Sequence, residues 1–77
     1  MPQQIKNPKV GVKYNIVPQK DDAFFESSLI DNGNKIGFEY IKTEICIYFK
    51  HPISGNELLF MPSVKIYEFS KNFKMPE

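Results

Sequence analysis

The chain has 77 residues, enough for one small domain but few for a deep, water-excluding active site. Ten lysines and no arginine stand against nine acidic residues, for a formal net charge of +1. Because arginine supplies the bidentate contacts used on guanine and phosphate, this composition argues against tight nucleic-acid binding. The single cysteine, Cys46, excludes an internal disulfide framework.

Residues 1–8 contain two prolines, two glutamines and an asparagine, which predicts a flexible, extended N-terminal arm. The apolar core of a signal peptide does not follow Met1, and the longest apolar clusters are too short to cross a bilayer. We therefore expect a cytoplasmic protein with no membrane partner.

The segment Lys9–Val17 alternates between apolar and polar residues, the period of a half-buried strand. Pro18 ends the predicted strand because proline cannot donate to the ladder. One face would carry Val10, Val12, Tyr14 and Ile16, and the other Lys9, Gly11, Lys13 and Asn15.

A hairpin is predicted next. Ala23–Ile30 forms its first strand and Ile36–Tyr40 its second. The turn is Asp31–Asn34, because Asn-Gly between apolar runs favours a type I′ turn.

The remaining strands are short. After a tight connection at Lys42–Glu44, Ile45–Lys50 is a fourth strand, rich in β-branched and aromatic residues. A turn at His51–Asn56 leads to a fifth strand, Glu57–Met61, and a last strand is expected from Ser63 through Phe69. A short helix capped by Ser63 is the alternative for that last segment.

Alternation also assigns the faces of these strands. Ile45, Ile47 and Phe49 should point inward, and Cys46, Tyr48 and Lys50 outward. The aromatic residues expected in the core are Tyr14, Phe38 and Phe49, with Phe25 and Phe60 beside them.

Five or six short strands joined by Gly, Asn and Pro turns favour a small antiparallel barrel or sandwich, and closing the sheet into a barrel also removes exposed edges. The chain resembles the SH3-like barrels in its opening strand Val10–Val17 and its two hairpins, Phe24–Tyr40 and Glu44–Phe60. The closing segment Met61–Tyr67 is similar to the short turn into a last strand of such barrels. The resemblance implies an all-β barrel over residues 9–69, after an arm at 1–8 and before a short tail at 70–77. The ALYDY-like signature of SH3 domains and the Tudor aromatic cage are missing, so it does not imply peptide or methyl-lysine recognition.

The sequence offers little for catalysis. Cys46 and His51 are the only soft metal ligands, and their odd spacing on one strand points them to opposite faces. The serines do not lie in a Gly-x-Ser-x-Gly turn, and the glycines do not form a phosphate-binding motif. We expect no enzyme activity, no metal site and no cofactor.

The candidate binding residues are outward aromatics with neighbouring lysines. They are Tyr48, Tyr67, Phe69, Lys50, Lys65 and Lys13. Exposed rings can anchor a protein interface, so the first hypothesis is a non-catalytic protein-binding module: an adaptor, an inhibitor or a small subunit of an assembly. The competing interpretation is that the outer rings pack under the chain termini.

The alternative function is nucleic-acid binding, in which Lys9, Lys13, Lys50 and Lys65 contact phosphates and the exposed rings stack on bases. Glutamates interleaved with the lysines favour an ordinary soluble surface instead. A homodimer formed by pairing of the edge strand Glu57–Met61 is a further alternative.

Overall fold

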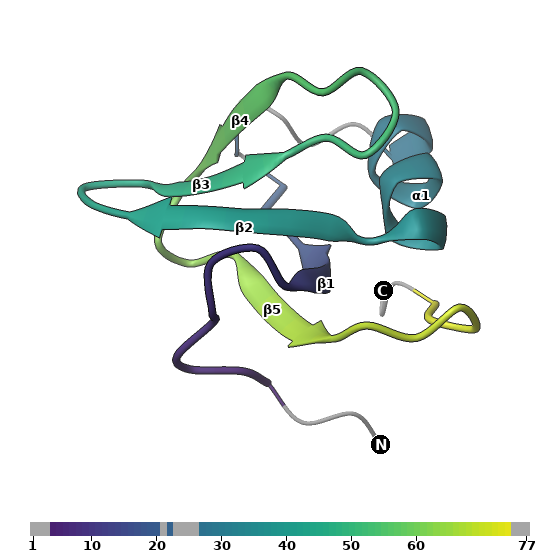
Figure 1. Cartoon of the computed structure of the whole chain (residues 1–77), viewed down its shortest axis with the longest axis horizontal. Helices are drawn as coiled ribbons and strands as arrows, with labels where there is room; N and C mark the ends of the chain where they lie inside the picture. Colours follow the sequence, from purple (N-terminus) through teal and green to yellow (C-terminus); the bar gives the residue numbers. More distant parts are fainter. Residues whose placement is uncertain (1–3, 21, 23–26, 75–77) are drawn as a thin grey trace.

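The structure is a computed structural model that describes residues 4–20, 22 and 27–74 (Figure 1). In chain order its elements are β1 (Lys13–Val17), α1 (Ser27–Ile36), β2 (Phe38–Thr43), β3 (Ile47–Lys50), β4 (Glu57–Phe60) and β5 (Lys65–Glu68). Across the described ranges, no helix is long and apolar enough to cross a membrane.

The strands form one antiparallel five-stranded sheet in the order β4-β3-β2-β1-β5. The mainly β prediction is confirmed. The sheet does not close, because in the described part of the chain β4 and β5 lie at its two ends and do not pair. The SH3-like barrel therefore stays a prediction.

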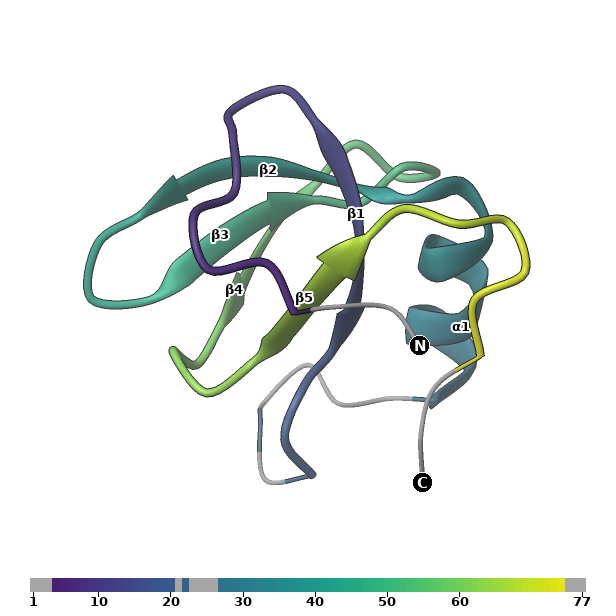
Figure 2. The same cartoon turned by 90° about the horizontal axis from the view of Figure 1, so that it is seen from below.

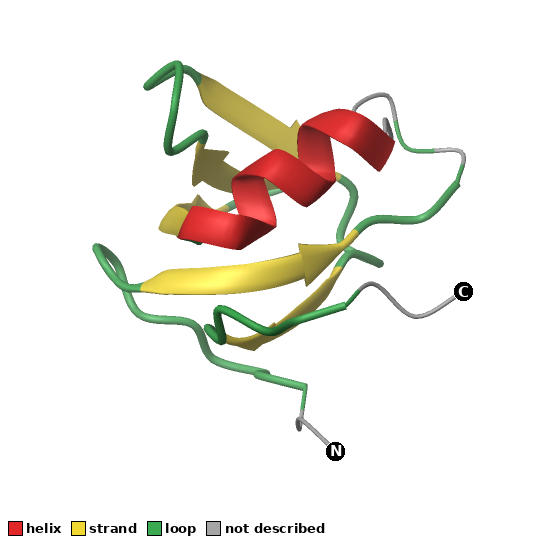
Figure 3. Cartoon of the chain, turned by 90° about the vertical axis from the view of Figure 1, so that its right-hand side faces the viewer, coloured by secondary structure: helices red, strands yellow, loops and turns green. Residues whose placement is uncertain are grey.

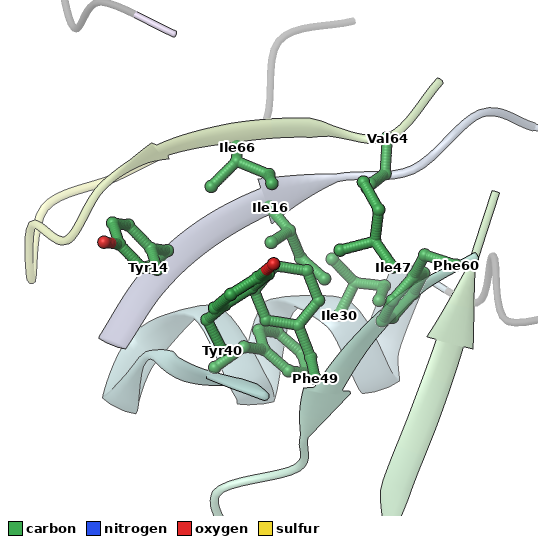
Figure 4. Close-up of a cluster of buried hydrophobic side chains, with 10 residues drawn as sticks. Tyr14, Ile16, Ile30, Tyr40, Ile47, Phe49, Phe60, Val64 and Ile66 are labelled. Atoms are coloured by element: carbon green, nitrogen blue, oxygen red, sulfur yellow. The ribbon is translucent and has the colours of Figure 1, made fainter. Parts of the chain in front are cut away.

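The sheet curves around a single core, and α1 covers one side of it (Figure 3). The predicted core aromatics Tyr14, Phe38, Phe49 and Phe60 are all buried, which confirms them, whereas Phe25 lies outside the described residues. Phe38, Phe49 and Phe60 meet edge to face, with ring centroids 5.8–6.4 Å apart. Figure 4 shows how α1, β1, β2, β3, β4 and β5 send side chains into this cluster.

Helix α1 replaces the predicted hairpin. Its range includes Asp31–Asn34, so the predicted turn is wrong, as is the described end of the predicted strand Ala23–Ile30; residues 23–26 lie outside the described part. Among residues 30–36 of the helix, the buried ones are Ile30, Gly33 and Asn34, at the three- and four-residue spacing of helix neighbours. Two of these three residues are not apolar, and Asn32-Gly33 is a common turn pair, so the residue types here favour a hairpin turn over a helix.

Gly33 lets the helix lie directly against the Phe38 ring. A Cβ atom at Gly33 would come within 2.0 Å of Phe38 Cζ, so any side chain would collide with the core. Glycine costs a helix about 0.5–1 kcal/mol relative to alanine. At Gly33 the close approach of the ring requires it nonetheless.

Gly37 ends the helix and starts β2 without a longer loop. Its φ of +98° is in the left-handed region that glycine adopts readily. Its backbone N–H donates to the carbonyl of Gly33 at 2.8 Å. The Phe69 ring lies against it, because a Cβ there would be 2.8 Å from Phe69 Cδ1.

A buried asparagine pair joins α1 to β1. β1 pairs with β2 at Lys13 and Tyr14, and beside Ile16 the side chain of Asn34 takes the place of a strand. Asn34 Oδ1 accepts from Ile16 N–H, and Asn34 Nδ2 donates to Ile16 C=O, both at 2.9 Å.

Asn15 completes the connection. Its amide donates to the Asn34 carbonyl at 2.8 Å, and its Oδ1 accepts from the Ser70 N–H at 2.7 Å. The prediction that Asn15 faces solvent is wrong, since it is 0% exposed. The C-terminal segment covers the face on which it lies.

Two strand starts also differ from the prediction. β1 begins at Lys13, and Lys9–Val12 form a turn closed by a Val12 N–H to Lys9 C=O bond of 3.2 Å, so the predicted inward side chain of Val10 is exposed. β3 begins at Ile47, and Ile45 lies in the β2–β3 connection, 89% exposed instead of buried.

The C-terminal strand is confirmed at Lys65–Glu68, and the helix alternative there is wrong because residues 63–73 contain no helix. The N-terminal segment runs beside this strand (Figure 2). Gln4 forms an antiparallel bridge with Tyr67, and the Ile5 N–H donates to Ile66 C=O at 2.7 Å. The domain boundaries at residues 9 and 69 stay predictions.

Candidate protein-binding surface

The structure divides the six predicted site residues between separate parts of the sheet. Tyr48 and Lys50 lie on β3, whereas Tyr67 and Lys65 lie on β5. Lys13 opens β1 and Phe69 follows β5. Since β2 and β1 stand between β3 and β5, these residues do not form one cluster.

The two rings at β5 make contacts within the chain. Tyr67 packs against Phe73 of the C-terminal segment, with centroids 5.5 Å apart and planes tilted by 39°. Phe69 lies over Gly37, and both rings are half-buried. This arrangement favours the interpretation that outer aromatics at this end pack under a terminus.

Tyr48 has a different environment. Its neighbours in β3, Ile47 and Phe49, point into the core, so the Tyr48 side chain points to the outer face, as predicted. The Lys42 ammonium lies 4.8 Å from the centroid of the Tyr48 ring, and Leu59 on β4 stands directly opposite Tyr48. We call the row formed by Lys42, Tyr48 and Leu59, together with Met61 two residues after Leu59 in the chain, the Tyr48 surface.

Bulge geometry places Lys42 over the ring. The register between β2 and β3 shifts between Tyr40 and Lys42, which brings Lys42 opposite Tyr48. Lys42 Nζ also contacts Glu44 Oε1 at 3.3 Å. The ammonium is therefore held between a carboxylate and an aromatic face, an arrangement that restrains both the lysine and the tyrosine.

Apolar exposure is the second property of the Tyr48 surface. Leu59 is 40% exposed and Met61 is 47% exposed, and neither is a core residue. Leu59 pairs directly with Tyr48, and Met61 follows two residues later, just after the end of β4. Exposed apolar groups that gather in one place are typical of an interaction site, whereas single ones are ordinary.

A charged row borders this surface. Cross-strand pairing sets Lys13 opposite Glu39, Glu39 opposite Lys50, and Lys50 opposite Glu57. Charge thus alternates along the row across β1, β2, β3 and β4, which favours the sheet and cancels locally. The row is a polar rim and not a basic patch.

His51 belongs to the core and not to this surface. Its Nδ1 accepts from the Ile53 and Ser54 N–H groups at 3.2 and 3.3 Å, and its ring meets Phe38 edge to face with centroids 5.6 Å apart. The residue is 4% exposed, and its Nε2 has no hydrogen-bond partner among the described residues. His51 therefore orders the β3–β4 turn.

Metal ligands do not gather in the part of the chain that the structure describes. No three His, Cys, Asp or Glu side chains in these ranges lie close enough to hold an ion. Cys46 is a half-buried free thiol in the β2–β3 connection.

Sequence reasoning missed Lys42, Leu59 and Met61 as members of the Tyr48 surface. Their signal is cross-strand register, which alternation along a single strand does not contain. Comparison with protein family models, with curated proteins and with solved structures finds no match for this chain.

Proposed function

We propose that this chain is a non-catalytic protein-binding module that captures its partner on the Tyr48 surface. The observation that carries the proposal is the row of Lys42, Tyr48 and Leu59 on three neighbouring strands. In this row a lysine ammonium lies over the tyrosine ring, and an exposed leucine lies on the other side of the tyrosine. The module would serve as an adaptor, an inhibitor or a small subunit.

Burial of the Tyr48 ring would supply most of the binding energy. Tyrosine is enriched among the few residues that dominate protein interfaces. The lysine above the ring holds it in place before binding, which reduces the entropy lost when the partner arrives. The neighbouring charged row of Lys13, Glu39, Lys50 and Glu57 would form the polar rim that such interfaces have.

The proposal includes the SH3-like arrangement implied by the sequence resemblance. Its support is the antiparallel β2–β3–β4 meander and the pairing of β1 with β5 around one core. A rigid sheet of this kind presents a surface without the cost of ordering a loop.

The charge pattern supports a protein partner over a nucleic acid. Lys13 and Lys50 each stand opposite Glu39, so the carboxylate that faces them would repel a phosphate. Lys65 lies opposite Val17 on another part of the sheet. Of the lysines proposed for nucleic-acid binding, Lys13, Lys50 and Lys65 thus do not share one uncompensated positive face, and Lys9 lies in the turn before β1.

Affinity capture tests the proposal. The full chain is immobilised and exposed to an extract of its native cells, with and without nuclease. We expect nuclease-resistant capture of a protein, and a loss of about tenfold or more for Tyr48→Ala, because the truncation removes a central ring.

The matched control is Ile53→Ala, which shortens an exposed apolar residue in the β3–β4 turn. This variant should capture the partner as the parent chain does. Equal capture by a folded Tyr48→Ala variant would refute the proposal, as would capture that disappears after nuclease treatment.

A further inference from the structure

We propose, beyond the function of the Tyr48 surface, that β4 is a dimerisation edge on which two copies of this chain pair antiparallel. The dimer would join the two sheets through backbone hydrogen bonds made by Glu57 and Leu59. This dimer depends on which backbone N–H and C=O groups of β4 point away from β3, and it does not require the capture of another protein.

The two ends of the sheet differ in how they are covered. The outer side of β5 receives the N-terminal segment, through the Gln4–Tyr67 bridge and the Ile5 N–H to Ile66 C=O bond. In residues 4–20, 22 and 27–74, no backbone segment pairs with the outer side of β4. Just beyond the strand, the Met61 N–H donates to Asp22 Oδ2 at 2.8 Å.

The phase of β4 follows from one hydrogen bond. The His51 N–H donates to Asn56 C=O at 2.8 Å, which makes this the hydrogen-bonded pair at the end of the β3–β4 ladder. Hydrogen-bonded and non-bonded pairs alternate in antiparallel sheets. Glu57, opposite Lys50, and Leu59, opposite Tyr48, are therefore non-bonded pairs whose N–H and C=O groups point away from β3.

These outward groups are self-complementary. A two-fold axis beside Leu58 places Glu57 opposite Leu59 of the partner subunit and Leu59 opposite Glu57 of the partner subunit. Each of these pairs exchanges two bonds, so four backbone bonds form from groups that already point outward. Half-buried Leu58 would meet Leu58 of the partner subunit on the inner side of the joined sheet.

Side-chain chemistry supports this edge. The strand Glu57–Phe60 contains neither lysine nor proline, the residues that usually protect an edge against pairing, and three of its four residues are apolar. The antiparallel register offsets Glu57 from its copy along the strand, whereas a parallel, in-register pairing would set the two carboxylates side by side. Charge repulsion thus selects the antiparallel arrangement.

Because only a few residues of each strand take part, we expect a weak dimer. Sedimentation equilibrium of the full chain from about 10 μM to about 1 mM covers the affinity of such a small interface. The apparent mass should rise with concentration toward twice that of one chain. A mass of one chain at every concentration would overturn the proposal.

Two variants locate the contact. Leu59→Pro removes an outward N–H for which the described residues provide no partner, and Leu59→Lys adds the charge that protects natural edges. Each should stay folded by circular dichroism and should sediment as one chain throughout. If the proline variant fails to fold, the lysine variant decides, and self-association of folded Leu59→Lys like that of the parent contradicts the proposal.

Control variants separate the edge from other surfaces. Ile53→Lys puts the same charge on an exposed apolar residue of the β3–β4 turn and should leave the association unchanged. Tyr48→Ala should also dimerise, because the ring is not part of the backbone pairing. Loss of association in Tyr48→Ala would instead assign the contact to the Tyr48 surface and overturn the edge pairing.

Amide hydrogen exchange supplies a direct readout. Exchange of the Leu59 N–H should slow as protein concentration rises, since the bond forms only in the dimer. The Leu58 N–H, which lies in a hydrogen-bonded pair with Phe49, should exchange slowly at every concentration. Concentration-independent exchange at Leu59 would contradict the proposal.

Discussion

At the residue scale, Asn34 joins helix α1 to β1 through buried hydrogen bonds. Its side-chain amide bonds both backbone groups of Ile16, and its own carbonyl accepts from Asn15. In a sheet, a neighbouring strand normally makes such bonds. β2 pairs with β1 at Lys13 and Tyr14, whereas beside Ile16 the bonds come from Asn34 of α1. The Asn34 side chain thereby provides hydrogen-bond partners for the buried backbone N–H and C=O of Ile16.

Replacing Asn34 by alanine should destabilise the fold strongly. The change leaves the N–H and C=O of Ile16 in the core without their partners, which costs about 1–3 kcal/mol for each unsatisfied group. Urea unfolding of Asn34→Ala measures the loss in the free energy of unfolding. Asn32→Ala, on the exposed side of the same helix, should unfold near the midpoint of the parent chain. Equal midpoints for the Asn34 and Asn32 variants would contradict this role.

At the element scale, the strands could be predicted and the helix could not. In β3 the inward and outward residues alternate, and the pattern correctly predicts Ile47 and Phe49 as inward. Within residues 30–36, helix α1 buries a glycine and an asparagine beside Ile30, residue types that are more typical of a turn than of a buried helix face. Asn32-Gly33, a strong turn signal in isolation, is overridden because Phe38 needs the space at Gly33.

The wrong face assignments have a related cause. Ile45 and Val10 continue an alternating pattern beyond the end of a strand, and alternation does not show where pairing stops. Asn15 is polar and correctly alternates outward from the core, but Ser70 covers it from a distant part of the chain. Such coverage depends on tertiary contacts that a local pattern does not contain.

The packing of α1 against the Phe38 ring can be tested by whether one substitution raises or lowers the free energy of unfolding. Gly33→Ala would stabilise an ordinary helix by about 0.5–1 kcal/mol. In this fold we expect the opposite, a loss of about 1–3 kcal/mol, because the new methyl group overlaps the Phe38 ring. Thermal or urea unfolding gives the sign, and stabilisation by Gly33→Ala would show that the helix does not lie on the ring.

A second substitution checks that this loss arises from the ring. In the Phe38→Leu background, Gly33→Ala should cost less than it does in the parent chain, since the smaller side chain leaves room for the methyl group. The difference is the coupling free energy of the double-mutant cycle. A coupling free energy of zero would assign the loss to another contact.

At the scale of the whole molecule, the sheet has two dissimilar ends. The β1–β5 end is covered by both terminal segments, through Gln4, Ser70 and Phe73. The β2–β3–β4 end carries the Tyr48 surface and the outer edge of β4. Of the six residues predicted for the site, Tyr48 and Lys50 lie at this second end. Sequence alone could predict that they point outward, but not which strands stand beside them.

The alternation of charge across the sheet predicts weak affinity for nucleic acids. Fluorescence anisotropy with labelled single- and double-stranded oligonucleotides at low salt should show no binding at micromolar protein, because Glu39 faces both Lys13 and Lys50. Glu39→Gln removes this carboxylate and is the matched comparison. Micromolar binding by the parent chain that weakens steeply with salt would favour the nucleic-acid alternative.

The central claim is that the Tyr48 surface contacts a partner protein. Site-specific photocrosslinking tests it most directly, with a benzophenone amino acid placed at position 48 or at the exposed turn position 53 in separate samples of the full chain. In native extract, the account predicts a discrete protein adduct from position 48 and none from position 53. An adduct of the same partner from position 53 with none from position 48 would contradict it.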